Sequence, residues 1–213
     1  MSETAVYIAP VVAAVRALWD RSGLLAGPVI GAQLSRFAGA LVAAHASGER
    51  AAAVLVGNWS DEGNDELSSA RRLSLEQARL IVARDHGFTS WSSVQGICDP
   101  VFERAVDAVV LGQVTALRAL LAEHPDLVAR RSAYGHRATL LHYMAANGVE
   151  IRRQVVPANA AEIAGSLLAA GADRSSQLYA YGGTFDVLEM LRTSAHPRAA
   201  GVSAEIERLL AIS

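Results

Sequence analysis

Apolar side chains in the first 98 residues recur every three to four positions, the spacing that predicts amphipathic helices. We expect helices over residues 11–21, 30–45, 49–58 and 74–86. Ser74, with Gln77 three residues later, is a capping-box motif at the start of the last helix, and Gly87 follows its end. The polar stretch 60–69, before this helix, is typical of a linker or mobile loop.

The pattern changes at Asp99–Pro100, and the second half of the chain is repetitive. Its clearest unit opens with Thr-Leu-Leu-His at 139–142 and closes with Ala-Gly-Ala-Asp at 170–173. Weaker copies of the opening keep the same register at 103–106 and 186–189. The repeats predict stacked helix pairs from residue 100 onward.

The middle unit gives the most specific expectations. Residues 140–147 should form its inner helix, with Thr139 at the start, and residues 161–169 should form its outer helix. Leu141 and Leu168 should then be buried on facing surfaces, so that changing either to Ala costs about 2–5 kcal/mol.

These motifs resemble the ankyrin repeat, with its Thr-Pro-Leu-His opening, except that Leu140 stands in place of the proline. The Gly-Phe-Thr-Ser-Trp turn at 87–91 extends the likeness to bacterial proteins that join a small helical N-terminal region to a few irregular ankyrin repeats. The resemblance implies an all-α fold. An ankyrin-repeat solenoid of about three irregular repeats would occupy residues 99–213, capped by a helical region over residues 1–98.

Two segments lengthen the repeats beyond the ankyrin period of about 33 residues. Residues 149–159 interrupt the middle unit and contain the charged pair Arg152-Arg153, and residues 196–202 interrupt the third. Insertions in repeat proteins form surface loops, and loops on a rigid scaffold often carry function. We therefore expect 149–159 to be exposed.

Aromatic and polar residues gather where ankyrin arrays form hairpin fingers, and Tyr and Arg are frequent hot spots at interfaces. The candidate partner-binding residues are Tyr134, His136, Arg137, Tyr143, Asn147, Tyr179 and Tyr181. The first five should form one exposed patch, because the inner helix directs two of them into the concave groove. The alternatives are packing of the tyrosines within their hairpins and an ordinary solvent-exposed helix face. Thr139 and His142 are expected to cap the inner helix.

A recognition module that binds a protein partner through the groove and fingers is the leading hypothesis. The alternative is a small metal-independent enzyme, such as an acid–base isomerase, cyclase or hydrolase, with its site between the N-terminal helices and the repeats. Its candidate catalytic residues are Asp107, His136, Tyr143, Asp186 and Glu189. A deep pocket with a carboxylate of raised pKa would favour the enzyme. An open polar groove would favour the module.

Composition narrows the chemistry further. The chain has no lysine, which excludes a P-loop lysine and a Schiff base. Its formal net charge of −2 gives no sign of nucleic-acid binding. No spacing of metal ligands or cofactor-binding motif is present, so we expect neither group. The single cysteine, Cys98, fits a reducing cytosol, and no apolar run reaches the roughly 18 residues of a membrane span. We expect a cytoplasmic protein whose partner is another protein, with a small-molecule ligand as a further possibility.

Overall fold

The computed structural model describes residues 4–23, 29–60 and 72–211 of the 213-residue chain. Helices account for most of the described backbone, and its strands form only two short antiparallel pairs, which confirms the all-α class. Apart from residue 60, the predicted loop 60–69 lies outside the described residues. Within them, no helix is both long and apolar enough to cross a bilayer.

Four helices form the N-terminal half where the apolar spacing predicts them. They are α1 (Pro10–Ser22), α2 (Ile30–Ala46), α3 (Arg50–Trp59) and α4 (Leu75–Asp85). The capping box of α4 is formed, because the Gln77 amide donates to Ser74 Oγ at 3.2 Å and the Ser74 amide donates to Gln77 Oε1 at 3.0 Å. Apolar faces of α1, α2 and α4 meet in a core that includes the fully buried Phe37 and Val82. A short 3-10 turn, η1 (Trp91–Ser93), follows.

The C-terminal half consists of shorter helices. They are α5 (Pro100–Val110), α6 (Val114–Glu123), η2 (Pro125–Val128), η3 (Leu140–Ala145), η4 (Ile151–Arg153), α7 (Ala160–Ala169), α8 (Val187–Thr193), α9 (Ala195–Ala199) and α10 (Ser203–Ala211). Helix α5 packs on α6 and α8 packs on α10, while α7 contacts both α6 and α10. Asp99 caps α5, with its Oδ1 accepting from the amides of Val101 and Phe102.

The predicted inner helix over 140–147 is shorter and more tightly wound than expected. The 3-10 helix η3 ends at Ala145, because Ala146 adopts left-handed backbone with a φ of 46° and Gly148 follows with a φ of 69°. Its start is capped as predicted, with the Thr139 amide donating to His142 Nδ1 at 3.1 Å. The early stop turns the chain directly into residues 149–159.

The prediction that residues 149–159 form an exposed loop is wrong. The segment lies between the two halves of the molecule, where η4 packs against α1. Strand β2 (Val156–Pro157) pairs with β1 (Val6–Tyr7) near the N-terminus. Glu150, Arg152 and Arg153 are all buried. The physical reason is that each of these charges finds a partner of opposite charge inside the protein.

Burial of the leucines agrees with the prediction at one position only. Leu141 is buried, but Leu168 is only partly buried, and its neighbour Leu167 occupies the fully buried position on α7. The helical phase of α7 is therefore one residue away from the predicted one.

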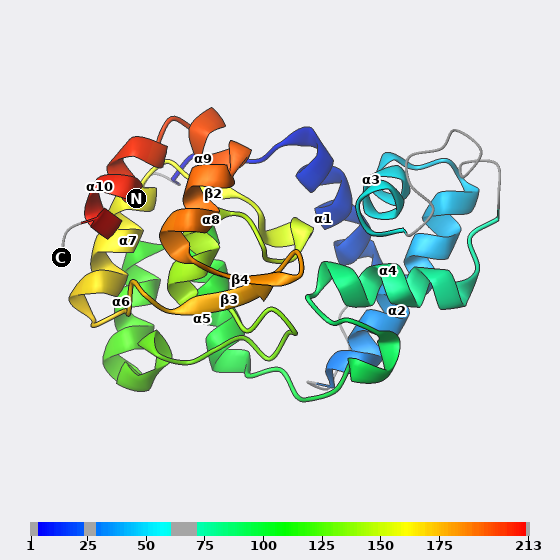
Figure 1. The fold of residues 1–213 in the computed structure, drawn as a ribbon, viewed down its shortest axis with the longest axis horizontal. Helices are drawn as coiled ribbons and strands as arrows, with labels where there is room; N and C mark the ends of the chain where they lie inside the picture. Colours follow the sequence, from blue (N-terminus) through cyan, green and yellow to red (C-terminus); the bar gives the residue numbers. More distant parts are fainter. Residues whose placement is uncertain (1–3, 24–28, 61–71, 212–213) are drawn as a thin grey trace.

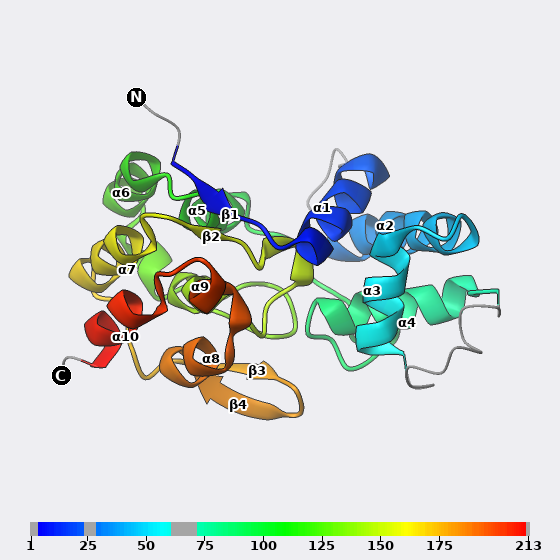
Figure 2. The same ribbon diagram turned by 90° about the horizontal axis from the view of Figure 1, so that it is seen from above.

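Helices α1–α4 lie on one side of the molecule and α5–α10 on the other (Figure 1). The blue strand β1 leaves the N-terminal half and runs beside β2 (Figure 2). A β-hairpin of β3 (Gln177–Ala180) and β4 (Gly183–Asp186) extends from the C-terminal half toward α4 (Figure 1). Segments from both halves therefore meet across the middle of the molecule.

Candidate functional site

A buried carboxylate, Glu150, lies at the centre of the contact between the halves. Its oxygens are 3.0 Å from His136 Nε2, 3.2 Å from Arg153 Nη1 and 3.4 Å from Arg152 Nη2. Burial alone would raise the pKa of Glu150, but the His136 hydrogen bond and the two guanidinium groups hold that pKa below its ordinary value. Glu150 is therefore charged at neutral pH, and His136, Arg152 and Arg153 stabilise its negative charge.

Arg153 connects this carboxylate to helix α5. Its guanidinium is 2.7 Å from Glu103 and 3.1 Å from Asp107, in addition to Glu150. Burial would lower the pKa of Arg153, but the surrounding carboxylates raise it well above its ordinary value. Asp107, a predicted catalytic residue, is thus an exposed partner of a structural ion pair.

Arg152 connects the same carboxylate to the N-terminal half. Its guanidinium carbon lies 4.1 Å from the centre of the Trp19 ring on α1, and its Nη2 donates to the Tyr134 hydroxyl at 3.1 Å. Arg16, also on α1, donates to the Arg152 carbonyl at 2.9 Å. The cation–π contact and the hydrogen bonds fix 149–159 against both halves.

Two glycines allow the backbones of the halves to touch. A Cβ on Gly135 would lie 2.2 Å from the carbonyl oxygen of Gly87, and a Cβ on Gly87 would lie 2.2 Å from the amide nitrogen of His136. The Gly135 amide donates to the His86 carbonyl at 2.9 Å. No larger residue fits at either position without moving backbone.

Six rings form a continuous buried series across this contact, with neighbouring centres 4.8 to 6.3 Å apart. They are Trp19, Phe37, His86, Tyr134, His136 and Tyr143. The exposed patch predicted from the sequence is therefore wrong for Tyr134, His136 and Tyr143, which are all at most 3% exposed. The contact between Gly87 and Gly135 holds residues 134–136 inside the protein, and η3 places Tyr143 in the core.

Asp85, the last residue of α4, joins three segments of the chain. Its Oδ1 accepts from Trp59 Nε1 and from the Ile151 amide, both at 3.2 Å, and its Oδ2 has no hydrogen-bond partner among the described residues. Burial, with a contribution from the Glu150 charge, raises the pKa of Asp85 to about 7. The two hydrogen bonds only partly offset this rise.

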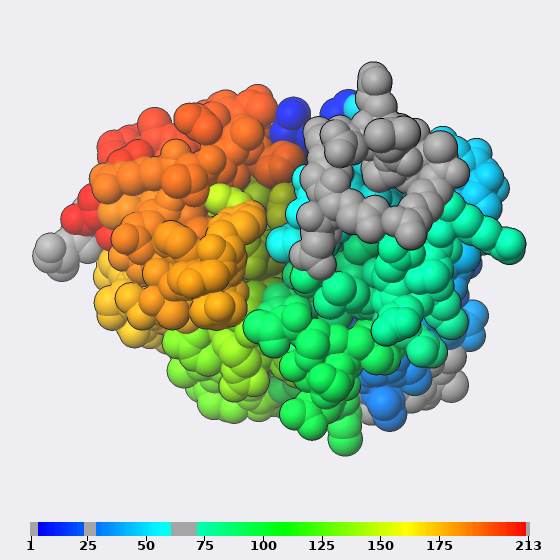
Figure 3. All heavy atoms as spheres, turned by 45° about the vertical axis from the view of Figure 1, so that its right-hand side comes forward, coloured from blue at the N-terminus to red at the C-terminus, as the bar shows by residue number. Residues whose placement is uncertain are grey.

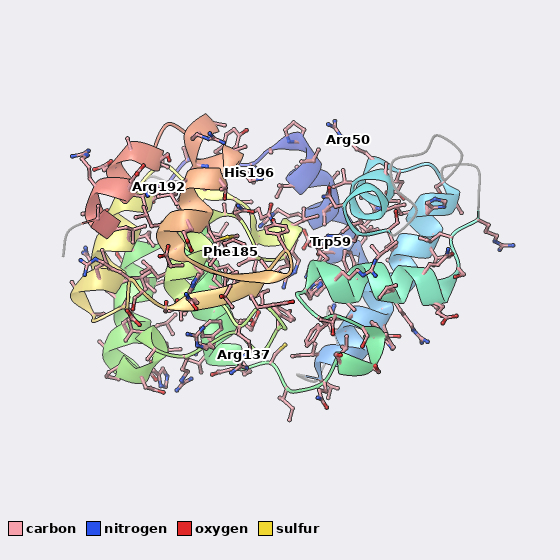
Figure 4. All side chains as sticks on the ribbon, viewed as in Figure 1. Arg50, Trp59, Arg137, Phe185, Arg192 and His196 are labelled. Atoms are coloured by element: carbon pink, nitrogen blue, oxygen red, sulfur yellow. The ribbon has the colours of Figure 1, made fainter. Side chains whose placement is uncertain are left out.

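A cavity of about 190 Å³ opens directly beside Asp85. Its walls come from the end of α3, from the end of α4 with residues 87–89, from Gly148 and Val149, and from the hairpin residues 179–182. In Figure 3 the orange hairpin faces the cyan-to-green α3 and α4 across this region. Trp59 lies on the side of α3 toward the C-terminal half (Figure 4). The cavity thus lies between the N-terminal helices and the C-terminal half, the region where the enzyme hypothesis places its site.

The hairpin supplies the exposed wall of this cavity. Tyr181 and Gly182 form its two-residue turn, with φ values of 51° and 79°. Tyr179 is 41% exposed and Tyr181 is 63% exposed. The Tyr181 hydroxyl donates to Asn147 Oδ1 at 2.8 Å, so the ring turns back over Gly148 toward the cavity.

The remaining predicted patch residues are distributed around this hairpin. Asn147 is half-buried, and its amide donates to Thr193 Oγ1 at 3.0 Å. Arg137 is exposed, and the hairpin is attached beside it, since the Tyr179 amide donates to the His136 carbonyl at 2.9 Å. Arg137 lies outside the cavity wall.

Of the five predicted acid–base residues, His136 and Tyr143 are neighbours, with ring centres 6.1 Å apart, but the five do not form one site. Asp186 and Glu189 form a capping box at the start of α8, with each backbone amide donating to the other's carboxylate at 2.9 Å. His136 and Tyr143 belong to the ring series, and none of the five lines the cavity. Asp186 and Glu189 thus cap the start of α8, while the buried His136 and Tyr143 pack in the core.

Of the predicted site residues, Tyr179 and Tyr181 line the cavity. Most of the other lining residues are not among those predicted: Gly87 and Phe88 belong to the turn motif at 87–91, and Trp59 and Asp85 end helices α3 and α4. Their only signal is the clustering of Trp59, Asp85 and Phe88 at helix ends, and the sequence does not show that these ends meet. Among the described residues, no group of three or more His, Cys, Asp or Glu is placed to hold a metal ion.

Comparisons with known proteins add no assignment. No protein-family model, curated protein or solved structure matches the chain.

Proposed function

We propose that this chain is a recognition module that binds a protein partner through the β3–β4 hairpin and the cavity beneath it. The helix pairs, the hairpin and the 139–142 cap support its interpretation as an irregular ankyrin array of about three repeats, capped by the helices before residue 99. The binding surface is not the concave groove inferred from the sequence, because Tyr143 is buried.

One observation carries the proposal: two exposed tyrosines stand at the opening of a preformed cavity. Tyr179 and Tyr181 contribute rings to its wall, and Trp59 and Phe88 line the opposite, N-terminal side. Aromatic side chains of this kind dominate binding energy at interfaces, because they bury large apolar area and lose little conformational entropy. A partner segment lying over the hairpin would contact all four rings.

The proposal places the protein in a reducing cytosol. Burial raises the pKa of the single Cys98 thiol to about 11, so this thiol is protonated and weakly nucleophilic at neutral pH. A chain with a single cysteine forms no intrachain disulfide, which is typical of cytosolic proteins.

Binding to the hairpin can be tested with a displayed library of linear 12-residue peptides. Peptides would be selected on wild-type protein and then measured against the Tyr179→Ala/Tyr181→Ala double variant. We expect their dissociation constants to rise about 30-fold or more, the equivalent of losing about 2 kcal/mol at an aromatic anchor. Ile97→Ala is the matched control, because Ile97 is 66% exposed and lies outside the cavity wall. Selected peptides that bind the double variant as tightly as wild type would contradict the proposal.

The second candidate function is an acid–base enzyme, which the carboxyl group of Asp85 favours. A carboxylic acid with a pKa near 7 beside a cavity is a typical general acid or base. The side chain of Asp85 has no exposed surface, however, and one of its oxygens already accepts two hydrogen bonds. A substrate could reach this buried carboxyl group only after neighbouring side chains moved, so binding is the better-supported function.

A metabolite mixture analysed by mass spectrometry separates the two functions. The binding proposal expects no compound to be consumed by wild-type protein. Consumption that is abolished in Asp85→Asn and retained in Ile97→Ala would establish the enzyme instead.

A further inference from the structure

We infer that the cavity between Trp59 and the hairpin receives one aromatic ring, the side chain of a phenylalanine or tyrosine from the partner. This inference rests on the proposed function for the source of the ring. The chemistry of the cavity itself is tested separately.

The first step is size. The cavity holds about 190 Å³. An apolar protein cavity of roughly 150 Å³ is known to hold benzene. The present cavity therefore has room for a six-membered ring and one or two further atoms.

The second step is the character of the walls. Trp59, Phe88, Tyr179 and Tyr181 line the cavity, and most of the surface they present is apolar. Edge-to-face and offset contacts between aromatic rings strengthen binding by about twofold to about tenfold beyond the burial of apolar area. An aliphatic side chain of equal volume would lose this contribution.

The third step is preorganisation. Trp59 is held by its hydrogen bond to Asp85 and by the Arg84 guanidinium, which donates to the Trp59 carbonyl at 2.8 Å. The Tyr181 hydroxyl is held by its hydrogen bond to Asn147. At Gly148 a Cβ would approach the Met190 methyl to 2.4 Å, so the packing around this wall is tight. A rigid cavity accepts a ring without reordering its own side chains, which improves affinity.

The fourth step concerns the source of the ring. Tyr179 and Tyr181 line the cavity and are 41% and 63% exposed, so a peptide lying on the hairpin would pass beside the cavity. A ring attached to a backbone can enter from this side while the partner chain runs over the tyrosines. This geometry favours a side chain over a free small molecule.

The experiment is an NMR titration read at the indole N–H of Trp59, which is one of three tryptophans in the chain. The probes are p-cresol, N-acetyl-L-tyrosinamide and cyclohexanol. We expect p-cresol and N-acetyl-L-tyrosinamide to give saturable shifts with dissociation constants within about threefold of each other. Cyclohexanol should bind about threefold to about tenfold more weakly than p-cresol, because it makes no contacts between aromatic rings.

A filled cavity provides the specificity control. Ala180→Leu places extra carbon atoms in the cavity wall and should abolish the shift caused by p-cresol. Thr184 lies on the same hairpin but outside the cavity wall, so Thr184→Leu should leave the p-cresol shift unchanged. Stability of both variants is checked by urea denaturation, so that loss of binding is not confused with loss of folding.

Three results would overturn the inference. Equal binding of cyclohexanol and p-cresol would show that the cavity does not select rings, and retained binding in Ala180→Leu would place the probe elsewhere. Binding of p-cresol with exclusion of N-acetyl-L-tyrosinamide would overturn the side-chain source. The proposed function is contradicted by a different result. In that case the aromatic probes bind the cavity, but selected peptides bind the Tyr179→Ala/Tyr181→Ala variant as tightly as wild type.

Discussion

Residues 149–159 and the β3–β4 hairpin both interrupt the helices of the C-terminal half, yet they have opposite environments. The first segment carries Glu150 and Arg153, which are buried in an ion-pair network. The second carries two tyrosines that are largely exposed to solvent. The charged segment thus holds the molecule together, while the aromatic segment is available to a partner.

This difference shows that the partners of a residue determine its location more than its polarity does. Arg153 is buried because Glu150, Glu103 and Asp107 surround it, so its charge is compensated. Tyr181 remains exposed because the two-residue turn carries it beyond the C-terminal core. Stability should therefore depend on the first segment and binding on the second.

The largest expected effect is from Glu150→Ala. Removing this carboxylate leaves Arg152 and Arg153 buried without their central partner, which should cost about 3–5 kcal/mol of unfolding free energy. Urea denaturation measures the loss. The exposed Glu162, 3.3 Å from Arg118, is the matched control, and Glu162→Ala should cost at most about 1 kcal/mol. Similar costs for the two variants would remove the distinction between buried and exposed charge.

Gly135→Ala should have the next largest effect. Its new Cβ would meet the Gly87 carbonyl at 2.2 Å, so the backbones of the two halves must separate. We expect a loss of about 2–4 kcal/mol in urea denaturation. A variant as stable as wild type would show that the two halves are not in close contact at this point.

Asp85→Asn should change how stability depends on pH. The pKa of Asp85 is raised to about 7 from an ordinary 3.8, so the folded state favours the neutral acid. Its contribution to stability is complete below pH 4 and is lost as the pH rises through 7. Asn stays neutral, so the variant does not lose this stability as the pH rises. Its free energy of unfolding should therefore increase relative to that of wild type by up to about 4 kcal/mol between pH 4 and pH 8.

Urea denaturation at both pH values measures this gain. Glu150, Arg152 and His86 surround the carboxyl group and are present in both proteins, so their own titrations largely cancel in the difference. A difference between variant and wild type that is independent of pH would mean that Asp85 is charged throughout the range.

The smallest expected effect is an increase in stability from Gly39→Ala. This glycine lies within α2, and nothing lies within 4 Å of a Cβ added there. Alanine should stabilise the helix by about 0.5–1 kcal/mol, as measured by thermal or urea unfolding. A loss of stability here would mean that the cost at Gly135 arises from something other than the backbone contact.

The parts of the fold that depend on neighbouring residues could be predicted from the sequence. Helices α1 to α4 follow from apolar spacing, and the caps at Ser74 and Thr139 follow from residues three positions away. The burial of 149–159 could not be predicted, because the partners of Arg153 include Glu103 and Asp107, which are more than forty residues away. For the same reason the helix ends that line the cavity could not be predicted, although Tyr179 and Tyr181 on the hairpin were among the predicted residues.

The most direct test of the account is the position of a bound peptide. Nuclear Overhauser effects between a selected peptide and isotope-labelled protein show which side chains the peptide contacts. We expect contacts from one aromatic ring of the peptide to Trp59, Phe88 and Tyr181. Contacts confined to the open groove between α6 and α7, around Arg118 and Gly165, would contradict the assignment of binding to the hairpin and its cavity.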